Sequence, residues 1–204
     1  LITFQVALHV EMLEKFEESE RLFAMALDSF HDLLAIQICV YQRLINIRID
    51  NEKFNLALQT TTALIERLVK TSSNDISYRR LLASYDVIRL FLLLILQPHP
   101  QRLRADYAKT LDAYTWEAYE KLNIPMSYLD ETLFYLLQSI TLAVQARDLK
   151  HIDQLEYDLH QQAQIDARHV HLFHILKKKM AGHFIDTFKF DQQTSTANDV
   201  TEYR

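Results

Sequence analysis

The stretch LEKFEESERLFAMAL, residues 13–27, is echoed by NEKFNLALQTTTAL at residues 51–64, and this internal similarity decides the expected fold. Both copies contain Glu-Lys-Phe followed by a small side chain, Ser19 in the first copy and Ala57 in the second, 38 residues apart. The glycine that usually precedes the turn in such repeats is absent, and Glu14 and Asn51 stand near its place. The pattern predicts repeated helix hairpins, in which a small residue lets two helices approach closely.

Composition supports a protein built almost entirely from helices. The 204 residues include one glycine and three prolines, and 49% of them are hydrophobic while 24% are charged. Strand-rich folds need many turn glycines, so this composition disfavours all-β and doubly wound α/β folds. We therefore expect an all-α, TPR-like α-solenoid of antiparallel helix hairpins, with a generic helical bundle as the alternative.

Charge and cysteine content restrict the partners and the compartment. The formal net charge of −5 gives no electrostatic support for a nucleic-acid partner. No apolar run approaches the roughly 20 residues of a membrane-spanning helix, and no signal peptide is visible, so we expect no membrane insertion. Cys39 is the only cysteine and lies in an apolar context, so we expect a small core residue and a reducing cytosolic or nuclear compartment.

Apolar residues at helical spacing predict nine helices. Ser127 is the expected N-cap of the seventh helix, with Asp130 in its first turn, and Asp148 and Asp166 are expected to cap the last two helices. The third helix is rich in β-branched residues that also suit a strand, but its 17-residue length favours a helix. The expected helices lie at about residues 2–14, 13–30, 33–49, 52–69, 78–97, 103–121, after Pro125, 149–163 and 167–180.

The expected domain organisation has four parts. They are N-terminal hairpins at 1–70, a linker (TSSNDIS) at 71–77, C-terminal hairpins at 78–181 and a mostly polar, irregular tail at 182–204. A weaker third copy of the repeat turn is expected in ARDLKHIDQL, residues 146–155. The chain starts at Leu1 already in a helical pattern, which suggests a segment of a longer protein with a truncated start.

No constellation of residues predicts catalysis or a resident cofactor. A single glycine excludes a glycine-rich phosphate loop, and no nucleophile elbow is present. His171 and His174 lie about one turn apart, but no H-E-x-x-H motif or cysteine supplies further zinc ligands. We interpret them, with His169, as amphipathic side chains of a semi-exposed helix, and we expect a protein that is not an enzyme and holds no metal or cofactor.

The segment RLFLLLILQPHP, residues 89–100, raises the question of what covers it. Seven apolar residues run without interruption from Leu90 to Leu96, whereas an ordinary surface helix has a single apolar stripe. Either flanking helices enclose the run, or a partner protein covers its outer face. The residues expected at such an interface, each with internal core as its alternative, are Leu90, Leu92, Leu93, Leu94, Trp116, Tyr119, Phe134 and Tyr135.

Three motifs, in order within residues 80–180, resemble a known family. VIRLFLLLILQPHPQRL, YAKTLDAYTWEAY and ETLFYLLQSITLA are similar to the family of the 40-kDa huntingtin-associated protein, also called factor VIII intron 22 protein. The resemblance implies a non-enzymatic TPR-like α-solenoid that binds and stabilises huntingtin, a very large HEAT-repeat protein, in an expected one-to-one complex. It also implies a cytoplasmic protein, with a nuclear pool, that is linked to early endosomes and vesicle motility through a Rab GTPase.

The chain departs from this family at two places. The family has further N-terminal helices and a proline-rich segment where TSSNDIS stands here, so residues are expected to be missing at the start and near 70–77. The alternative function is a TPR-type adaptor that binds a linear peptide motif in its concave groove. Such an adaptor predicts a polar groove with Lys, Arg or Asn residues on the inner helices.

Overall fold

The computed structural model describes residues 2–30, 33–71, 76–98, 103–115 and 128–197, with side chains described up to Gly182. All regular secondary structure in these ranges is α-helical, which confirms the all-α class. The chain forms two compact units, residues 1–103 and 104–204. Among the described helices, none combines the length and the apolar character that crossing a membrane requires.

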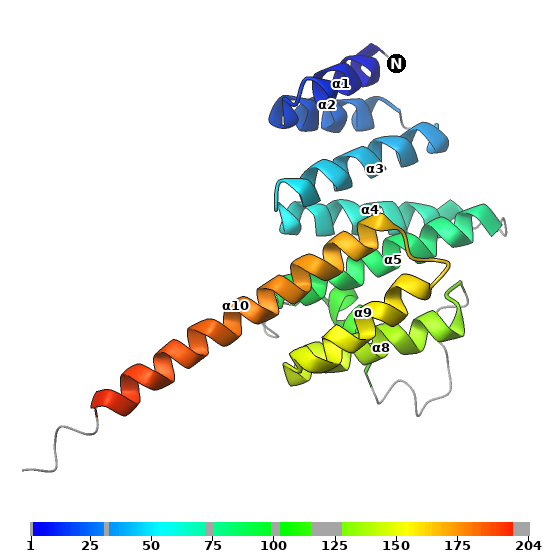
Figure 1. Cartoon of the computed structure of the whole chain (residues 1–204). Helices are drawn as coiled ribbons and strands as arrows, with labels where there is room; N and C mark the ends of the chain where they lie inside the picture. Colours follow the sequence, from blue (N-terminus) through cyan, green and yellow to red (C-terminus); the bar gives the residue numbers. More distant parts are fainter. Residues whose placement is uncertain (1, 31–32, 72–75, 99–102, 116–127, 198–204) are drawn as a thin grey trace, which may run out of the picture. The chain divides into compact units, whose positions relative to one another are not determined.

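The first unit is a stack of helices in which each helix packs against the next one along the chain (Figure 1). The prediction that the β-branched segment 33–49 is helical is confirmed. The sequence predicts that the helix at 78–97 belongs to the C-terminal hairpins, but in the structure this helix lies in the first unit and packs against the helix before it. The TPR-like solenoid itself stays a prediction. The helices are α1 (Ile2–Met12), α2 (Phe16–Ser29), α3 (Leu34–Asp50), α4 (Phe54–Thr71) and α5 (Ile76–Leu96).

The two similar segments form the same turn. Glu14 and Glu52 occupy equivalent positions, and both have a left-handed backbone with φ of 58° and 56°. In each turn the amide of the following lysine, Lys15 or Lys53, donates to the carbonyl five residues earlier, at 3.3 Å and 2.8 Å. This is the Schellman turn that often ends a helix, where the left-handed residue is usually glycine. The sequence repeat is therefore a repeat of turn geometry, with Glu52 and not Asn51 at the glycine position.

A third copy of this turn joins the helices on either side of Arg147. The φ of Arg147 is 55°, and the amide of Asp148 donates to the carbonyl of Ala143 at 2.9 Å. The turn lies in the segment 146–155, which the internal similarity of the sequence predicts to be a weaker copy of the repeat turn. All three turns place a residue with a side chain where glycine has no steric cost.

Replacing Glu52 by glycine is expected to stabilise the protein. A non-glycine residue in the left-handed region is strained, so Glu52→Gly should raise the free energy of unfolding by about 0.5–1 kcal/mol. Urea denaturation followed by circular dichroism measures this change. The matched control is Glu66→Gly, at an exposed position inside α4, where glycine should lower stability by about 1 kcal/mol. A loss of stability in both variants would contradict the proposed strain.

The small residues of the repeat lie where helices approach closely. Ser19 and Ala57 are both fully buried. The hydroxyl of Ser19 donates to the carbonyl of Ala7 in α1 at 3.1 Å, so the backbone of α1 lies directly against the Ser19 side chain. A larger side chain at this position has no room. The expectation that small residues permit helix contact therefore holds at the α1–α2 pair.

Cys39 is exposed, so the expectation that it belongs to the core is wrong. Its neighbours Ile38 and Val40 are buried, as are Tyr41 and Leu44 one turn further on. An α-helix turns by about 100° per residue, and Cys39 lies outside the arc that these residues bury. The exposure of Cys39 could not be predicted from the sequence, because apolar residues occupy most of the circumference of α3.

A partly buried ion-pair network joins α2, α3 and α4 of the first unit. Glu20 of α2 accepts hydrogen bonds from Arg48 Nε at 2.8 Å and from Lys53 Nζ at 2.9 Å. Arg48 also donates to the hydroxyl of Thr60 in α4. Burial raises the pKa of Glu20, but the hydrogen bonds from Lys53 and Arg48 outweigh it, so the pKa lies below its ordinary value of 4.5. Glu20 therefore connects α2 to the last turn of α3, through Arg48, and to the turn before α4, through Lys53.

Glu20→Gln is expected to lower the free energy of unfolding at neutral pH by about 1.5–3 kcal/mol, because Arg48 loses a charged partner. The pKa of Glu20 is depressed in the folded state, so its stabilisation is complete above pH 4.5 and is lost as the pH falls through the folded-state pKa. Urea denaturation at pH 7 and below pH 4 should therefore show the two proteins converging in acid. A difference that is independent of pH would contradict the ionic origin.

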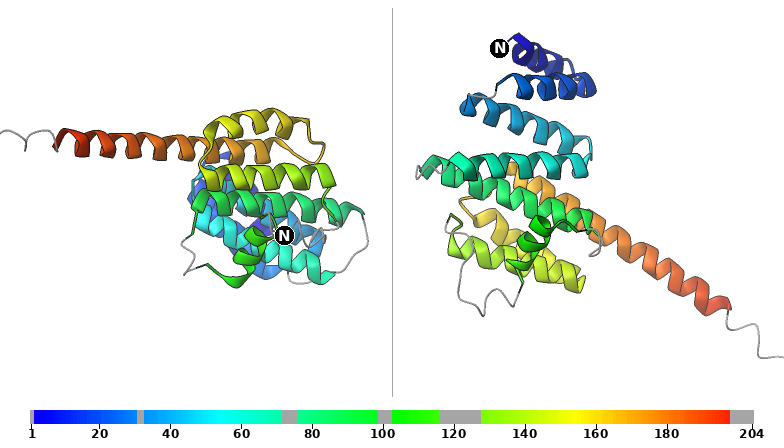
Figure 2. Two further views of the ribbon diagram at one scale, coloured as in Figure 1. Left: turned by 90° about the horizontal axis from the view of Figure 1, so that it is seen from below. Right: turned by 180° about the vertical axis from the view of Figure 1, so that it is seen from behind.

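The second unit contains α6 (Ala105–Asp112), α8 (Glu131–Ala146), α9 (Leu149–Gln161) and α10 (Ala167–Ala197). α8 packs against α9, and α9 packs against the first part of α10, which continues well beyond it (Figure 2). α6 is shorter than the expected helix 103–121. The chain leaves α geometry after Asp112 through tighter bonds, in which Thr115 N–H donates to the Asp112 carbonyl at 3.1 Å. Residues 116–121 lie outside the described residues.

α10 corrects the prediction of an irregular tail from residue 182. The helix continues through Gly182 to Ala197, while residues 198–204 lie outside the described part of the chain. No proline occurs between Gly182 and Ala197, and one internal glycine lowers the stability of a helix by only about 1 kcal/mol. A polar composition therefore did not imply irregular structure, because helix-breaking residues were absent.

The caps of the last helices follow the prediction, whereas that of α8 differs. Asp148 accepts from the amide of His151 at 3.0 Å, and Asp166 accepts from the amide of Arg168 at 2.9 Å. A hydrogen bond with the ring of His169 lowers the pKa of Asp166 to about 2, although partial burial raises it. Asp130 stands at the N-cap of α8 and not in its first turn, and Ser127 lies outside the described residues.

Candidate interaction surfaces

Most of the residues predicted for a partner interface are buried in the structure. Leu90, Leu92, Leu93 and Leu94 of α5 expose almost none of their surface. This agrees with the interpretation in which the apolar run is internal core, because the buried leucines offer almost no surface to a partner. Their role at an interface stays a prediction without structural support. Trp116 and Tyr119 lie outside the described residues.

Phe134 and Tyr135 are neighbours in α8 with opposite environments. Phe134 is buried and stacks on the ring of Tyr114, which follows α6, with centroids 5.3 Å apart. The side-chain amide of Gln138, Nε2, donates to the carbonyl of Thr115 at 3.0 Å, so it joins α8 to the same segment as Tyr114. Phe134 therefore belongs to the core between α8 and the end of α6, and Tyr135 alone among the described predicted residues is exposed, at 37%.

The exposed side of α8 forms a stripe with Tyr135 at its centre. We call this set the α8 stripe. Its members recur every three or four residues, which places them on one side of the helix. The residues between them, such as Leu133 and Leu136, are buried on the other side. The α8 stripe consists of Glu131, Thr132 and Tyr135, which are exposed, and of Ser139 and Leu142, which are half-buried.

The Tyr135 ring is held in place within the stripe. Its hydroxyl donates to Glu131 Oε1 at 3.1 Å, and its edge meets the ring of Phe134 with centroids 5.9 Å apart. An exposed tyrosine that is already ordered loses little conformational freedom on binding, which favours a contact role. At the start of the stripe, hydrogen bonds from the Thr132 hydroxyl and from backbone amides lower the pKa of Asp130. Asp130, at the edge of the α8 stripe, is therefore negatively charged at neutral pH.

The sequence reasoning missed a second exposed surface, on α1. Ala7 is the only buried residue of α1 among those described, and the helix packs against α2. The signal was present in ITFQVALHVEM, because its apolar residues occupy more than the one stripe that a single neighbour covers. Exposed apolar surface of this kind marks interaction sites. The α1 face consists of Ile2, Val6 and Met12 of α1 and of Leu13 in the turn that follows.

No protein-family model matches the chain. The 40-kDa huntingtin-associated protein of Mus musculus is 36% identical over 101 residues, which are 49% of this chain and 26% of that protein. The protein of the same name from Rattus norvegicus is 35% identical over 101 residues, with the same coverage. The aligned part of the chain thus spans about a quarter of the length of these relatives. The two matches confirm the resemblance that the three motifs indicated.

Proposed function

We propose that this chain is a binding subunit without catalytic activity and that it associates with huntingtin. The observation that carries the proposal is its similarity to two proteins that are named for association with huntingtin. The one-to-one stoichiometry, the stabilisation of huntingtin and the link to early endosomes through a Rab GTPase are parts of this proposal that rest on the family resemblance alone.

The exposed surfaces give the proposal a physical basis. A helical stack that presents an apolar α1 face gains free energy when a partner covers that face, at about 25 cal/mol per Å² of apolar area. The α8 stripe offers an ordered tyrosine with a polar rim, and tyrosine is enriched among residues that dominate binding energy. The buried leucines of α5 contribute indirectly, because they hold the scaffold in one shape.

Tyr135→Ala is expected to weaken the complex with huntingtin about tenfold, by removing a central aromatic contact. The chain is first co-expressed with huntingtin, and size-exclusion chromatography with light scattering establishes whether a one-to-one complex forms. The dissociation constants of the wild-type and variant chains are then compared. Tyr157→Ala is the matched control, because Tyr157 is a tyrosine of α9 in the same unit, 70% exposed and outside the α8 stripe.

The possible results separate the partner from the surface. A wild-type chain that remains a monomer in the presence of huntingtin would contradict the proposed partner, and a search for bound linear peptides would then test the adaptor alternative. Equal affinities of Tyr135→Ala and Tyr157→Ala for huntingtin would leave huntingtin as the partner but would contradict the α8 stripe as its binding surface. In that case Val6→Glu on the α1 face, compared with Val69→Glu at an exposed position of α4, tests the second surface.

A further inference from the structure

Three side chains capable of binding a metal ion meet on the surface of the α9–α10 pair. Glu156 and His160 lie one turn apart on α9, and His174 faces them from α10. One ligand atom from each residue lies within 4.8 Å of the other two. Among the described residues, this is the group of histidine and acidic side chains that comes close enough to share an ion.

The geometry requires only small movements to bind a tetrahedral ion. Zinc–nitrogen and zinc–oxygen bonds of about 2.0–2.1 Å place ligand atoms about 3.4 Å apart. His174 Nε2 and Glu156 Oε1 are 2.8 Å apart, and the rings of His160 and His174 have centroids 6.4 Å apart. Both histidines are exposed, so their rings are free to rotate into position without disturbing the core. The ligand atoms are thus preassembled by helices that pack against each other.

The surrounding charges allow a divalent cation. Lys177 Nζ lies 2.7 Å from Glu156 Oε2 and 2.8 Å from Asp153 Oδ1. Lys177 therefore binds Oε2 of Glu156, whereas His174 lies next to Oε1. Oε1 is thus the carboxylate oxygen that remains available to an ion. Asp153 and Glu156 together outweigh the positive charge of Lys177, so the site carries a net negative charge before an ion binds. Second-sphere hydrogen bonds of this kind fix the orientation of ligating carboxylates.

We propose that Glu156, His160 and His174 form a binding site for Zn²⁺, with water as the fourth ligand. Imidazole nitrogens with one carboxylate are a ligand set that zinc accepts, whereas calcium and magnesium prefer oxygen ligands alone. The ion joins α9 to α10, so it stabilises the folded chain by an amount that grows with the ratio of free zinc to its dissociation constant. The sequence did not predict this site, because His174 was paired with His171 on its own helix and not with residues of α9.

The test is a zinc titration of the purified full chain at neutral pH, in competition with a chromogenic chelator. We expect one equivalent of Zn²⁺ to bind, and His174→Ala and His160→Ala each to weaken binding at least tenfold. Zinc at a hundred times its dissociation constant should lower the ratio of unfolded to folded protein about a hundredfold. Magnesium should give neither binding nor stabilisation.

His171→Ala is the matched control, because His171 is an exposed histidine of α10 outside the cluster. This variant should bind zinc with wild-type affinity. Circular dichroism of each variant verifies that the exposed substitutions leave the helices intact. The proposal is overturned if the wild-type chain binds no stoichiometric zinc, or if His171→Ala weakens binding as much as His174→Ala does, since the latter indicates nonspecific binding by surface histidines.

Discussion

Leu93→Asp is expected to unfold the helical stack that contains α5, and not merely to remove a contact with a partner. Leu93 is 1% exposed, so the new carboxylate would lie in the core, where Arg89, one turn earlier on α5, already pairs with Asp86. Removing an unpaired charge from water costs several kcal/mol, and the lost burial of leucine adds about 1.5–3 kcal/mol. Because domains are stable by only about 5–15 kcal/mol, the substitution should remove most of the stability.

Circular dichroism and urea denaturation of the isolated chain measure this effect. Ile76→Asp is the matched control, because Ile76 is an exposed apolar residue at the first position of the same helix, where a carboxylate is favourable. Its stability should stay within about 0.5 kcal/mol of the wild type. If Leu93→Asp folds normally and fails only to bind huntingtin, the leucine run forms an interface, which would contradict its assignment to the core.

The helices and their turns were predictable from the sequence because they depend on local interactions. Periodicity located the helices of the first unit to within a few residues, and the Glu-Lys-Phe repeat marked two turns with the same left-handed residue at Glu14 and Glu52. The end of α6 was not predictable, because the residues after Asp112 have helical spacing but leave the helix to place Tyr114 against Phe134 of α8. That contact joins segments about 20 residues apart, and no local pattern encodes it.

The surfaces were less predictable, because a sequence pattern shows that a residue is apolar but not which side of its helix is covered. The leucine run attracted the interface prediction by its length, yet it is buried in α5, while the shorter apolar excess of α1 is exposed. The same limit explains Glu20, whose partners Arg48 and Lys53 lie about 30 residues away. The pairing of His174 with Glu156 likewise depends on the packing of two helices.

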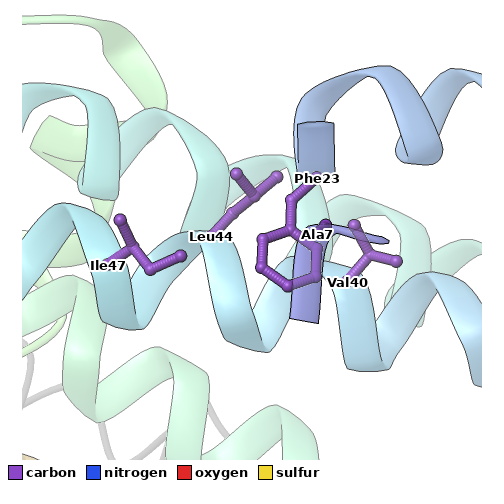
Figure 3. Packing of buried hydrophobic residues seen from close by; sticks show 5 residues of the cluster. All are labelled: Ala7, Phe23, Val40, Leu44 and Ile47. Carbon is purple, nitrogen blue, oxygen red and sulfur yellow. The ribbon is translucent and has the colours of Figure 1, made fainter. Parts of the chain in front are cut away.

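Phe23→Ala is expected to lower the free energy of unfolding by about 3–5 kcal/mol, the cost of removing a large aromatic side chain from a packed core. Phe23 is fully buried where α1, α2 and α3 meet, and Figure 3 shows its ring between Val40 and Leu44 of α3, beside Ala7 of α1. Its ring also meets the edge of Phe4, with centroids 5.8 Å apart. Ala7 and Val40 of the same cluster are too small to fill the cavity that the ring leaves.

The matched control for this cavity is Phe16→Ala, the same substitution in the same helix at a residue that is 41% exposed. Because Phe16 buries only part of its ring, its truncation should cost about 1 kcal/mol. Phe16 occupies the same repeat position as Phe54, which is buried in the second copy. A small loss for Phe16→Ala would therefore show that burial, and not the position in the repeat, determines how much a phenylalanine stabilises the protein. Equal losses for Phe16→Ala and Phe23→Ala in urea denaturation would mean that Phe16 is covered in solution, and the α1–α2 end of the stack would then be closed by contacts beyond those described here.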